Sequence, residues 1–163
     1  MSRAATRTDP AKTARGADWL KLDRQLCFAL YSSSLAMTKL YKPLLEPLGL
    51  TYPQYLVLLV LWEGDGLAVG EVGARLHLDS GTLTPLLKRL EAAGLVQRER
   101  AADDERRVLI RLTPAGRGLR ARARRVPEAL ATASGCNVRE LGELVARLQA
   151  LRDRIAVPIP EAA

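Results

Sequence analysis

The residues of this chain that could form a chemically reactive site are one of its two thiols and two phenols. Cys27 lies early in a long helical pattern, and Tyr41 and Tyr52 follow it in a chain with only four tyrosines. Phenol hydroxyls can donate hydrogen bonds to a thiolate, and a thiolate stabilised in this way attacks peroxides. A lone cysteine on a helix is more often a small buried hydrophobic residue, so both interpretations of Cys27 stay open.

The spacing of Cys27 and Tyr41 decides how such a site is assembled. The two residues are 14 positions apart on one uninterrupted helical pattern. A helix rises about 1.5 Å per residue, so about 21 Å separate them and they cannot meet within one subunit. At about 100° per residue, both lie within about 40° of one helix face. If that face meets an antiparallel partner, Cys27 of one chain can reach Tyr41 of the other, and the site exists only in a dimer.

A second set of polar residues has the side chains that read DNA. Hydroxyl groups can hydrogen-bond bases or phosphates, cations suit phosphates, and arginines at a hairpin tip can enter a narrow minor groove. The candidate DNA-binding residues are Ser80, Thr82, Thr84, Lys88, Arg89, Arg106 and Arg107. The alternative for each part of this set is a solvated helix face and an ordinary hairpin.

Composition and charge limit the class of protein that presents these residues. The chain has 163 residues, of which 48% are hydrophobic and 4% aromatic, which fits one mostly helical domain with extensions. The formal net charge is +7, and the excess is mostly arginine, 20 residues against 5 lysines. Arginine suits contacts to phosphates and guanine edges, so the charge favours a nucleic-acid partner.

Several other classes of protein are disfavoured. The longest apolar run, Leu56 to Trp62, has seven residues, whereas a membrane helix needs roughly 20, so no membrane association is expected. The first 19 residues lack the apolar core of a signal peptide, which predicts a cytoplasmic protein with reduced thiols. With a single histidine beside two cysteines, a zinc site of usual composition is nearly excluded, and no cofactor is predicted.

Hydrophobic periodicity predicts a mainly α fold with a small β-hairpin. Pro43 should end the first long helix, with one short extra turn before Gly49. Asp79 or Ser80 should cap a later helix, and Gly94 should end it. The expected helices span residues 19–42, 53–63, 68–76, 80–93, a segment that opens at Thr113-Pro114, and 138–156, and the expected strands span 95–100 and 107–112. Two short helices followed by a hairpin describe a winged helix-turn-helix, which on a basic chain favours DNA binding.

The segment LTPLLKRLEAAGLVQRERAADDERRVLIRLTPAGR resembles the MarR family of bacterial transcription factors. The resemblance runs from about residue 20 to 155 and implies a dimer of winged helix-turn-helix subunits joined by their first and last helices. The match of residues 104–107 and of Leu112-Thr113 to the family's wing implies that Arg106 reads the minor groove at the wing tip. Asp104 is expected to orient a neighbour, because phosphate would repel it.

The segments LDRQLCFALY, LYKPLL and LTYPQYLVLLVLWE closely resemble one branch of that family, the organic hydroperoxide resistance regulators. In that branch, a cysteine of the N-terminal helix is hydrogen-bonded by two tyrosines of the partner subunit, and the matching positions are Cys27, Tyr41 and Tyr52. In its two-cysteine class, a C-terminal cysteine of the other subunit captures the oxidised one. Cys136 lies in the matching region, with a structural or incidental thiol as the alternative.

The resemblance implies a homodimeric repressor, not an enzyme, that binds double-stranded operator DNA and releases it when an organic hydroperoxide oxidises Cys27. Its implied regions are a disordered arm at 1–16, a dimerisation and redox-sensing region at 17–50, a winged helix-turn-helix at 51–112, and dimerisation helices with a tail at 113–163.

Three alternatives to this function stay open. The nearest is a MarR repressor released by a small phenolic or lipophilic ligand in the dimer crevice, with inert cysteines. A thiol peroxidase is a different class, and neither a CxxC motif nor a thioredoxin-like pattern supports it. An architectural chromatin protein would show only weak operator preference.

Overall fold

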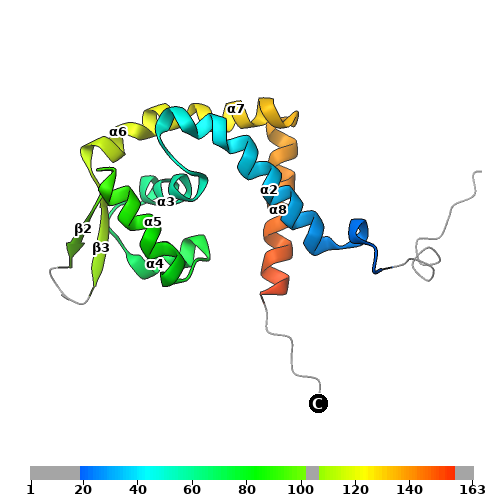
Figure 1. The fold of residues 1–163 in the computed structure, drawn as a ribbon, viewed down its shortest axis with the longest axis horizontal. Helices are drawn as coiled ribbons and strands as arrows, with labels where there is room; N and C mark the ends of the chain where they lie inside the picture. The colour runs from blue at the N-terminus through cyan, green and yellow to red at the C-terminus, as the bar shows by residue number, and fades with distance from the viewer. Residues whose placement is uncertain (1–18, 102–106, 157–163) are drawn as a thin grey trace, which may run out of the picture. The chain divides into compact units, whose positions relative to one another are not determined.

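The computed structural model describes residues 19–101 and 107–156, and the predicted arm at residues 1–16 lies outside them (Figure 1). The chain divides into a smaller unit, residues 1–38, and a larger unit, residues 39–163, which are described separately. The helices are α2 (Leu26–Leu45), α3 (Tyr52–Glu63), α4 (Val69–Leu76), α5 (Ser80–Ala92), α6 (Pro114–Ala123), α7 (Arg125–Ser134) and α8 (Val138–Ile155), with short 3-10 turns η2 (Leu22–Arg24) and η3 (Glu46–Leu48). The strands are β1 (Leu67–Ala68), β2 (Val96–Arg100) and β3 (Val108–Leu112). The fold is mainly α with a small sheet, as predicted.

The first long helix, α2, begins and ends later than the sequence pattern predicts. The predicted start at Trp19 is wrong, because Gln25 is extended, with φ −84° and ψ 116°, and separates η2 from α2. The predicted end at Pro43 is also wrong, because α2 continues to Leu45. The fixed φ of proline suits a helix, and its missing N–H removes one hydrogen bond in the last turn only. The expected extra turn is η3, which Gly49 ends at φ 68°.

The apolar helix predicted from Pro53 to Glu63 is confirmed as α3, the central helix of the larger unit. A capping box starts it, in which the Thr51 N–H donates to Gln54 Oε1 at 2.8 Å. Half of its side chains are buried against neighbouring helices and the sheet. The core that results contains Leu45, Val57, Leu58, Leu61, Val72, Leu83, Leu87, Leu90 and Ile110.

The predicted helix-turn-helix is formed by α4 and α5, which gather beside α3 (Figure 1). His77 ends α4 in the left-handed conformation, with φ 55°. A Cβ on Gly73 would lie 2.9 Å from the carbonyl oxygen of Leu78, so the tight connection requires glycine there. Asp79 caps α5, and Gly94 follows the helix at φ 68°, as the sequence indicates.

The predicted hairpin is the larger part of a three-stranded antiparallel sheet with the order β1-β3-β2. Strands β2 and β3 pair in the register that sets Val96 opposite Leu112. The sequence did not predict β1, because two residues are too few to show alternation. This short strand pairs Leu67 with Ile110. The hairpin tip, residues 102–106, lies outside the described residues.

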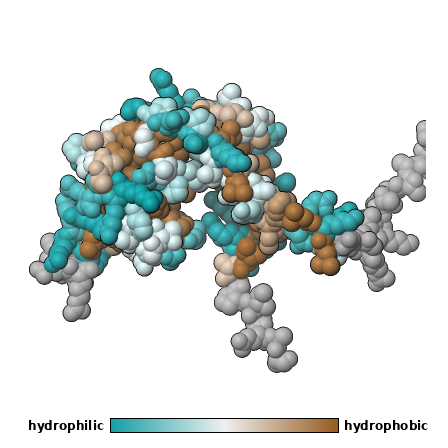
Figure 2. Space-filling view, in the orientation of Figure 1, coloured by the Kyte–Doolittle hydropathy of each residue, from teal (hydrophilic) through white to brown (hydrophobic). Residues whose placement is uncertain are grey.

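The C-terminal part of the larger unit forms three helices. The predicted opening at Thr113-Pro114 is confirmed, because Thr113 caps α6, but Arg124 then separates α6 from α7. The predicted last helix is confirmed as α8. Hydrophobic residues at the surface are brown in Figure 2, and the large exposed ones on α8 are Val138, Leu144, Val145, Leu148 and Ile155.

Among residues 19–101 and 107–156, no single helix is long and apolar enough to cross a membrane. The segments Leu26–Leu48 and Tyr52–Glu63 meet the length and composition criteria only when they are joined across a bend.

Candidate redox and DNA-binding residues

The Cys27 thiol is exposed at the start of α2, where it is the second residue of the helix. In the single chain it is therefore open to an oxidant rather than buried as a small hydrophobic residue. Large hydrophobic side chains on both sides of it are also exposed: Leu22, Leu26, Phe28, Tyr31 and Leu35. The smaller unit thus presents a thiol within an apolar surface.

The two predicted phenols lie together in the larger unit. Tyr41 is in the last part of α2 and Tyr52 is the first residue of α3, and their ring centroids are 4.6 Å apart. A third phenol, Tyr55, lies 6.0 Å from Tyr41 by ring centroids. Burial, reinforced by the neighbouring Tyr52 and Tyr55, raises the pKa of Tyr41 to about 12. Burial also raises the pKa of Tyr52, so both hydroxyls keep their protons and can donate hydrogen bonds.

Cys136 follows α7 and precedes the cap of α8, and its thiol is free and half-buried. Its Sγ lies 3.7 Å from the carbonyl oxygen of Ser134. A cavity of about 360 Å³ opens beside it, lined by Gly135, Cys136, Glu140, Glu143, Leu144 and Arg147. Within the described ranges, no cluster of three or more histidine, cysteine or acidic residues is placed to hold a metal ion.

The predicted DNA-reading hydroxyls lie in the first turns of α5. The carboxylate of Asp79 accepts the backbone N–H of Thr82 at 2.8 Å and also the Thr82 hydroxyl. These two hydrogen bonds lower the pKa of Asp79. Ser80 and Thr82 are exposed, whereas Thr84 is half-buried. The two predicted cations, Lys88 and Arg89, are exposed, and the opposite face packs into the core through Leu83, Leu86, Leu87 and Leu90. That these side chains contact DNA stays a prediction.

Of the two predicted wing residues, Arg106 and Arg107, the structure describes only Arg107. Arg106 lies outside the described residues, so its predicted place at the wing tip is untested. Arg107 directly precedes β3 and is exposed. Its carbonyl oxygen accepts the N–H of Ala101 at 2.9 Å, which continues the β2–β3 pairing beyond the strands.

Sequence reasoning missed one contact between the wing and α5. The guanidinium of Arg98 in β2 lies on the inner side of the sheet, with its Nε 3.4 Å from Glu91 Oε2 in the last turns of α5. Two of its nitrogens, Nε and Nη2, are buried without a hydrogen-bond partner among the described residues. Alternation along β2 could have placed Arg98 on the inner face, but only the fold shows that Glu91 faces it.

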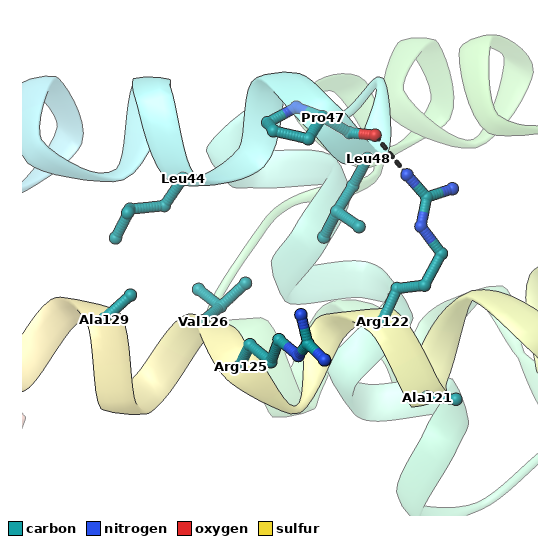
Figure 3. Close-up of a pocket in the computed structure, with 8 residues that line it drawn as sticks. All are labelled: Leu44, Pro47, Leu48, Ala121, Arg122, Arg125, Val126 and Ala129. Atoms are coloured by element: carbon teal, nitrogen blue, oxygen red, sulfur yellow. Dashed lines mark hydrogen bonds between the residues drawn. The ribbon is translucent and has the colours of Figure 1, made fainter.

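The arginines of α6 and α7 are exposed, and two of them make contacts within the chain. Arg117 Nη1 lies 3.1 Å from Asp65 Oδ2, and Arg122 donates to the carbonyl oxygen of Pro47. Arg122 and Arg125 border a cavity of about 490 Å³ between the end of α2 and α6–α7 (Figure 3). Leu44, Leu48, Val126 and other apolar residues line the rest of this cavity.

Comparison with known proteins places these residues in context. The family described as Transcriptional regulator SarA/Rot matches residues 39–122. The chain is similar to the organic hydroperoxide resistance transcriptional regulator of Bacillus subtilis. The two are 49% identical over 138 residues, which are 85% of this chain and 94% of the other.

Solved structures of AbfR, a protein of Staphylococcus epidermidis, are also similar to this chain. Reduced AbfR bound to DNA has a TM-score of 0.68 and 36% identity, and the match covers 89% of this chain and 96% of AbfR. Disulfide-formed AbfR has a TM-score of 0.58 and 38% identity, covering 86% of this chain and 98% of AbfR.

Proposed function

Because the chain belongs to the MarR family of winged helix-turn-helix regulators, in the branch of the organic hydroperoxide resistance regulators, we propose that it is a redox-sensing repressor. It is a DNA-binding transcriptional regulator, and its relatives are regulators rather than enzymes. In the proposed function, an organic hydroperoxide oxidises Cys27 and the protein then leaves its operator. The observation that carries the proposal is the pairing of Tyr41 with Tyr52, two protonated phenols 4.6 Å apart, in a chain whose Cys27 thiol is exposed.

The functional form is a homodimer, which the exposed apolar residues of α8 support. Val138, Val145 and Leu148 recur at steps of seven and three residues on a helix that is exposed along almost its whole length. Contiguous apolar surface of this kind marks a protein interface. α2 and α8 of two chains pack together in the proposed dimer, and Tyr41 and Tyr52 of one chain donate hydrogen bonds to the Cys27 thiolate of the other.

The chemical step is a two-electron oxidation of sulfur. The Cys27 thiolate attacks the terminal oxygen of the hydroperoxide, the O–O bond breaks, and the alkoxide takes up a proton and leaves as an alcohol. The thiolate becomes a sulfenic acid. The Cys136 thiolate of the other chain then attacks that sulfur, an S–S bond forms, the S–O bond breaks, and the oxygen leaves as water after protonation.

Oxidation has to shift the dimer between a DNA-binding and a released arrangement. Moving a two-state equilibrium from 1:99 to 99:1 requires a differential free energy of about 5.5 kcal/mol. In the proposed mechanism, the new S–S bond between the chains is the source of this free energy. The DNA-binding arrangement places α5 of each chain in the major groove and each wing at the minor groove.

The deciding experiment compares operator release by a hydroperoxide with release by its alcohol. A duplex selected by the reduced protein from a random pool serves as operator, and cumene hydroperoxide and 2-phenyl-2-propanol serve as oxidant and matched non-oxidant. The wild type should leave the operator with the hydroperoxide only. Cys27→Ser should bind equally well and stay bound with both compounds. Release of Cys27→Ser by the hydroperoxide would contradict the redox mechanism.

A ligand-released repressor with inert cysteines is the second candidate, and the cavities favour it. The cavity of about 490 Å³ combines apolar walls with the exposed guanidinium of Arg125, which suits a small lipophilic anion. If this function is correct, an aromatic carboxylate such as salicylate should release the wild type and Cys27→Ser alike. Arg125→Gln should then reduce that release.

A further inference from the structure

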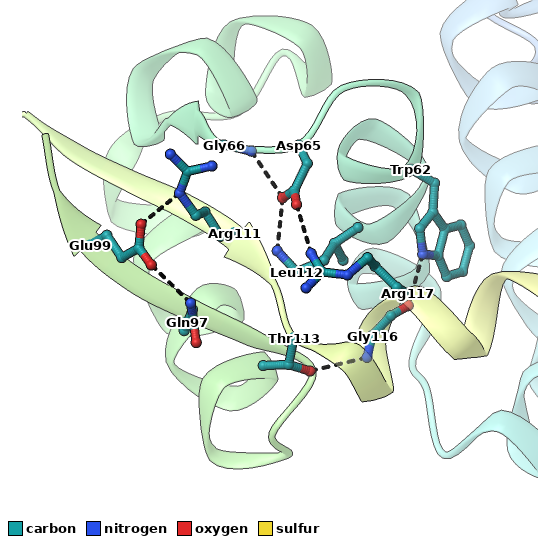
Figure 4. Close-up of polar contacts among 10 residues, drawn as sticks. All are labelled: Trp62, Asp65, Gly66, Gln97, Glu99, Arg111, Leu112, Thr113, Gly116 and Arg117. Atoms are coloured by element: carbon teal, nitrogen blue, oxygen red, sulfur yellow. Dashed lines mark hydrogen bonds and ion pairs between the residues drawn. The ribbon is translucent and has the colours of Figure 1, made fainter.

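Asp65 lies in the turn between α3 and β1, and its carboxylate joins three segments of the larger unit (Figure 4). Its Oδ1 accepts the N–H of Gly66 at 2.9 Å and the N–H of Leu112, the last residue of β3, at 2.8 Å. Its Oδ2 lies 3.1 Å from Nη1 of Arg117 in the first turn of α6. One side chain therefore contacts the end of the sheet and the start of the following helix.

The register of the sheet explains why a side chain, and not a strand, accepts the N–H of Leu112. The first residue of β1, Leu67, lies opposite Ile110 of β3, and no described residue before Leu67 pairs with β3 as a strand. Continuing the same register by two residues sets position 65 opposite Leu112. The chain turns away toward α3 at that point, and the Asp65 carboxylate accepts the N–H that a longer strand would have paired.

The first turn of α6 is also held from its other sides. The indole Nε1 of Trp62 donates to the carbonyl oxygen of Gly116 at 2.9 Å. A Cβ on Gly116 would lie only 2.0 Å from the carbonyl oxygen of Leu95, just before β2. Thr113 caps the helix and donates its hydroxyl to the carbonyl oxygen of Gly94 at 2.6 Å. The ends of β2 and β3 next to α6 are thus in direct contact with the first turn of α6, and the Asp65 carboxylate contacts both.

We propose that Asp65 is a positioning residue for operator binding. Through Arg117 it holds the first turn of α6, so that the wing, the hairpin of β2 and β3, keeps one orientation relative to α6. The proposal rests on the proposed function, since α6 leads from the wing into the helices of the proposed dimer. The Arg117 side chain is 57% exposed, so the ion pair contributes little to the free energy of unfolding. Its effect should therefore be on the geometry of DNA binding.

The test uses two arginines of the same helix as a matched pair. Arg117 contacts Asp65, whereas Arg120 is exposed and has no hydrogen bond or ion pair with another residue of the described ranges. Arg117→Gln and Arg120→Gln remove the same charge. Binding of reduced protein to the selected operator and to a non-specific duplex is measured over a range of salt concentrations.

Arg117→Gln should weaken operator binding by roughly two- to fivefold, the range of an exposed ion pair. Its binding to the non-specific duplex and its salt dependence should match those of Arg120→Gln. If Arg117 contacts a phosphate instead, both duplexes lose affinity and the slope of log K against log salt changes by about 0.9. That result, or an equal effect of both variants on the operator, would overturn the proposal.

A double-mutant cycle tests the role of Asp65 itself. Asp65→Asn keeps an oxygen for the N–H of Leu112 and removes the charge that attracts Arg117. The double variant Asp65→Asn, Arg117→Gln should bind the operator no more weakly than either single variant, whereas multiplicative losses would overturn the link. Urea midpoints show whether each variant is folded. Because all binding uses reduced protein, a missing response to hydroperoxide would contradict the proposed function and leave this test unchanged.

Discussion

The Asp79 carboxylate accepts two hydrogen bonds from Thr82, one from the backbone N–H at 2.8 Å and one from the hydroxyl at 3.0 Å. The backbone and side-chain bonds from Thr82 lower the pKa of Asp79, so the carboxylate is ionised at neutral pH and can only accept. The Thr82 hydroxyl therefore has its hydrogen directed at Asp79. What Thr82 presents to solvent, and in the proposed complex to DNA, is an oxygen that can only accept.

A first prediction concerns the base that faces Thr82. An accepting oxygen requires an amino group, which adenine and cytosine present in the major groove. In Asp79→Asn, the amide nitrogen donates to the Thr82 oxygen and frees the hydroxyl hydrogen, while asparagine remains as good an N-cap as aspartate. Selection from random duplexes should therefore move one operator position from adenine or cytosine toward guanine or thymine. An unchanged preference would show that Thr82 does not read a base.

The same residue makes a prediction about acid. A lowered pKa in the folded state means that Asp79 stabilises the protein above its unfolded pKa, near 3.8, and that this contribution disappears as pH falls through the folded value. The urea midpoint of Asp79→Ala should therefore be lower than that of the wild type at pH 7. The two midpoints should converge toward pH 2 if the charge is the cause.

The third prediction uses the raised pKa of Tyr41, about 12. A phenol with that pKa keeps its proton, and its ability to donate, throughout the range in which a thiol ionises. The rate of Cys27 oxidation should therefore not fall through loss of the Tyr41 proton at any pH below about 10. Tyr41→Phe should slow oxidation at every pH, as measured by the loss of free thiol under excess hydroperoxide. A Tyr41→Phe rate equal to that of the wild type would remove Tyr41 from the sensing site.

A fourth prediction separates two kinds of DNA contact. Lys88→Ala should weaken binding to all duplexes similarly and reduce the salt slope by about one unit, because a phosphate contact is lost. Arg106→Ala should weaken binding to the operator by about 1–3 kcal/mol, because it is expected to read the minor groove. Titrations at several salt concentrations on operator and non-specific DNA measure both effects. Unchanged affinity in both variants would contradict the proposed docking.

The fifth prediction concerns Cys136. One or two equivalents of organic hydroperoxide should give a covalent dimer, at about twice the 17.8 kDa chain mass on a non-reducing gel, that reductant converts back to monomer. Cys136→Ser should stop at the sulfenate or proceed to higher oxides, because nothing captures the intermediate. An oxidised monomer with an internal disulfide would contradict capture between chains. A wild type that accumulates only sulfenate would leave Cys136 without a role.

Local signals predicted most of the DNA-binding elements correctly. Asp79 and Gly94 delimit α5 in the sequence as in the structure, and the change of period after Gly94 predicted the hairpin. Elements without a local signal were missed. Strand β1 has two residues, and only its pairing with Ile110 makes it a strand. The break at Arg124 does have a local signal that was not used, because Pro127 lies in the first turn of α7 and has no N–H to bond the carbonyl oxygen of Ala123.

Some residues of the candidate sites were likewise found from the sequence, and others were missed. Tyr41 and Tyr52 were predicted together from a family resemblance, and the fold brings their rings within 4.6 Å. Asp65 was missed, because its contact with Leu112 spans 47 positions and follows from the sheet register alone. A carboxylate in a Gly-Asp-Gly turn is ordinary in a sequence, and only the folded chain shows which donors reach it.

The close approach of Gly116 to Leu95 also limits which residues position 116 can accept. A methyl group there would have to move about 1 Å away from the Leu95 carbonyl to reach even a tight contact distance of 3.0 Å. The first turn of α6 would have to shift relative to Leu95 and the start of β2. In the proposed dimer, Gly116→Ala should therefore alter the spacing of the two DNA-binding helices, although it leaves every residue expected to touch a base unchanged.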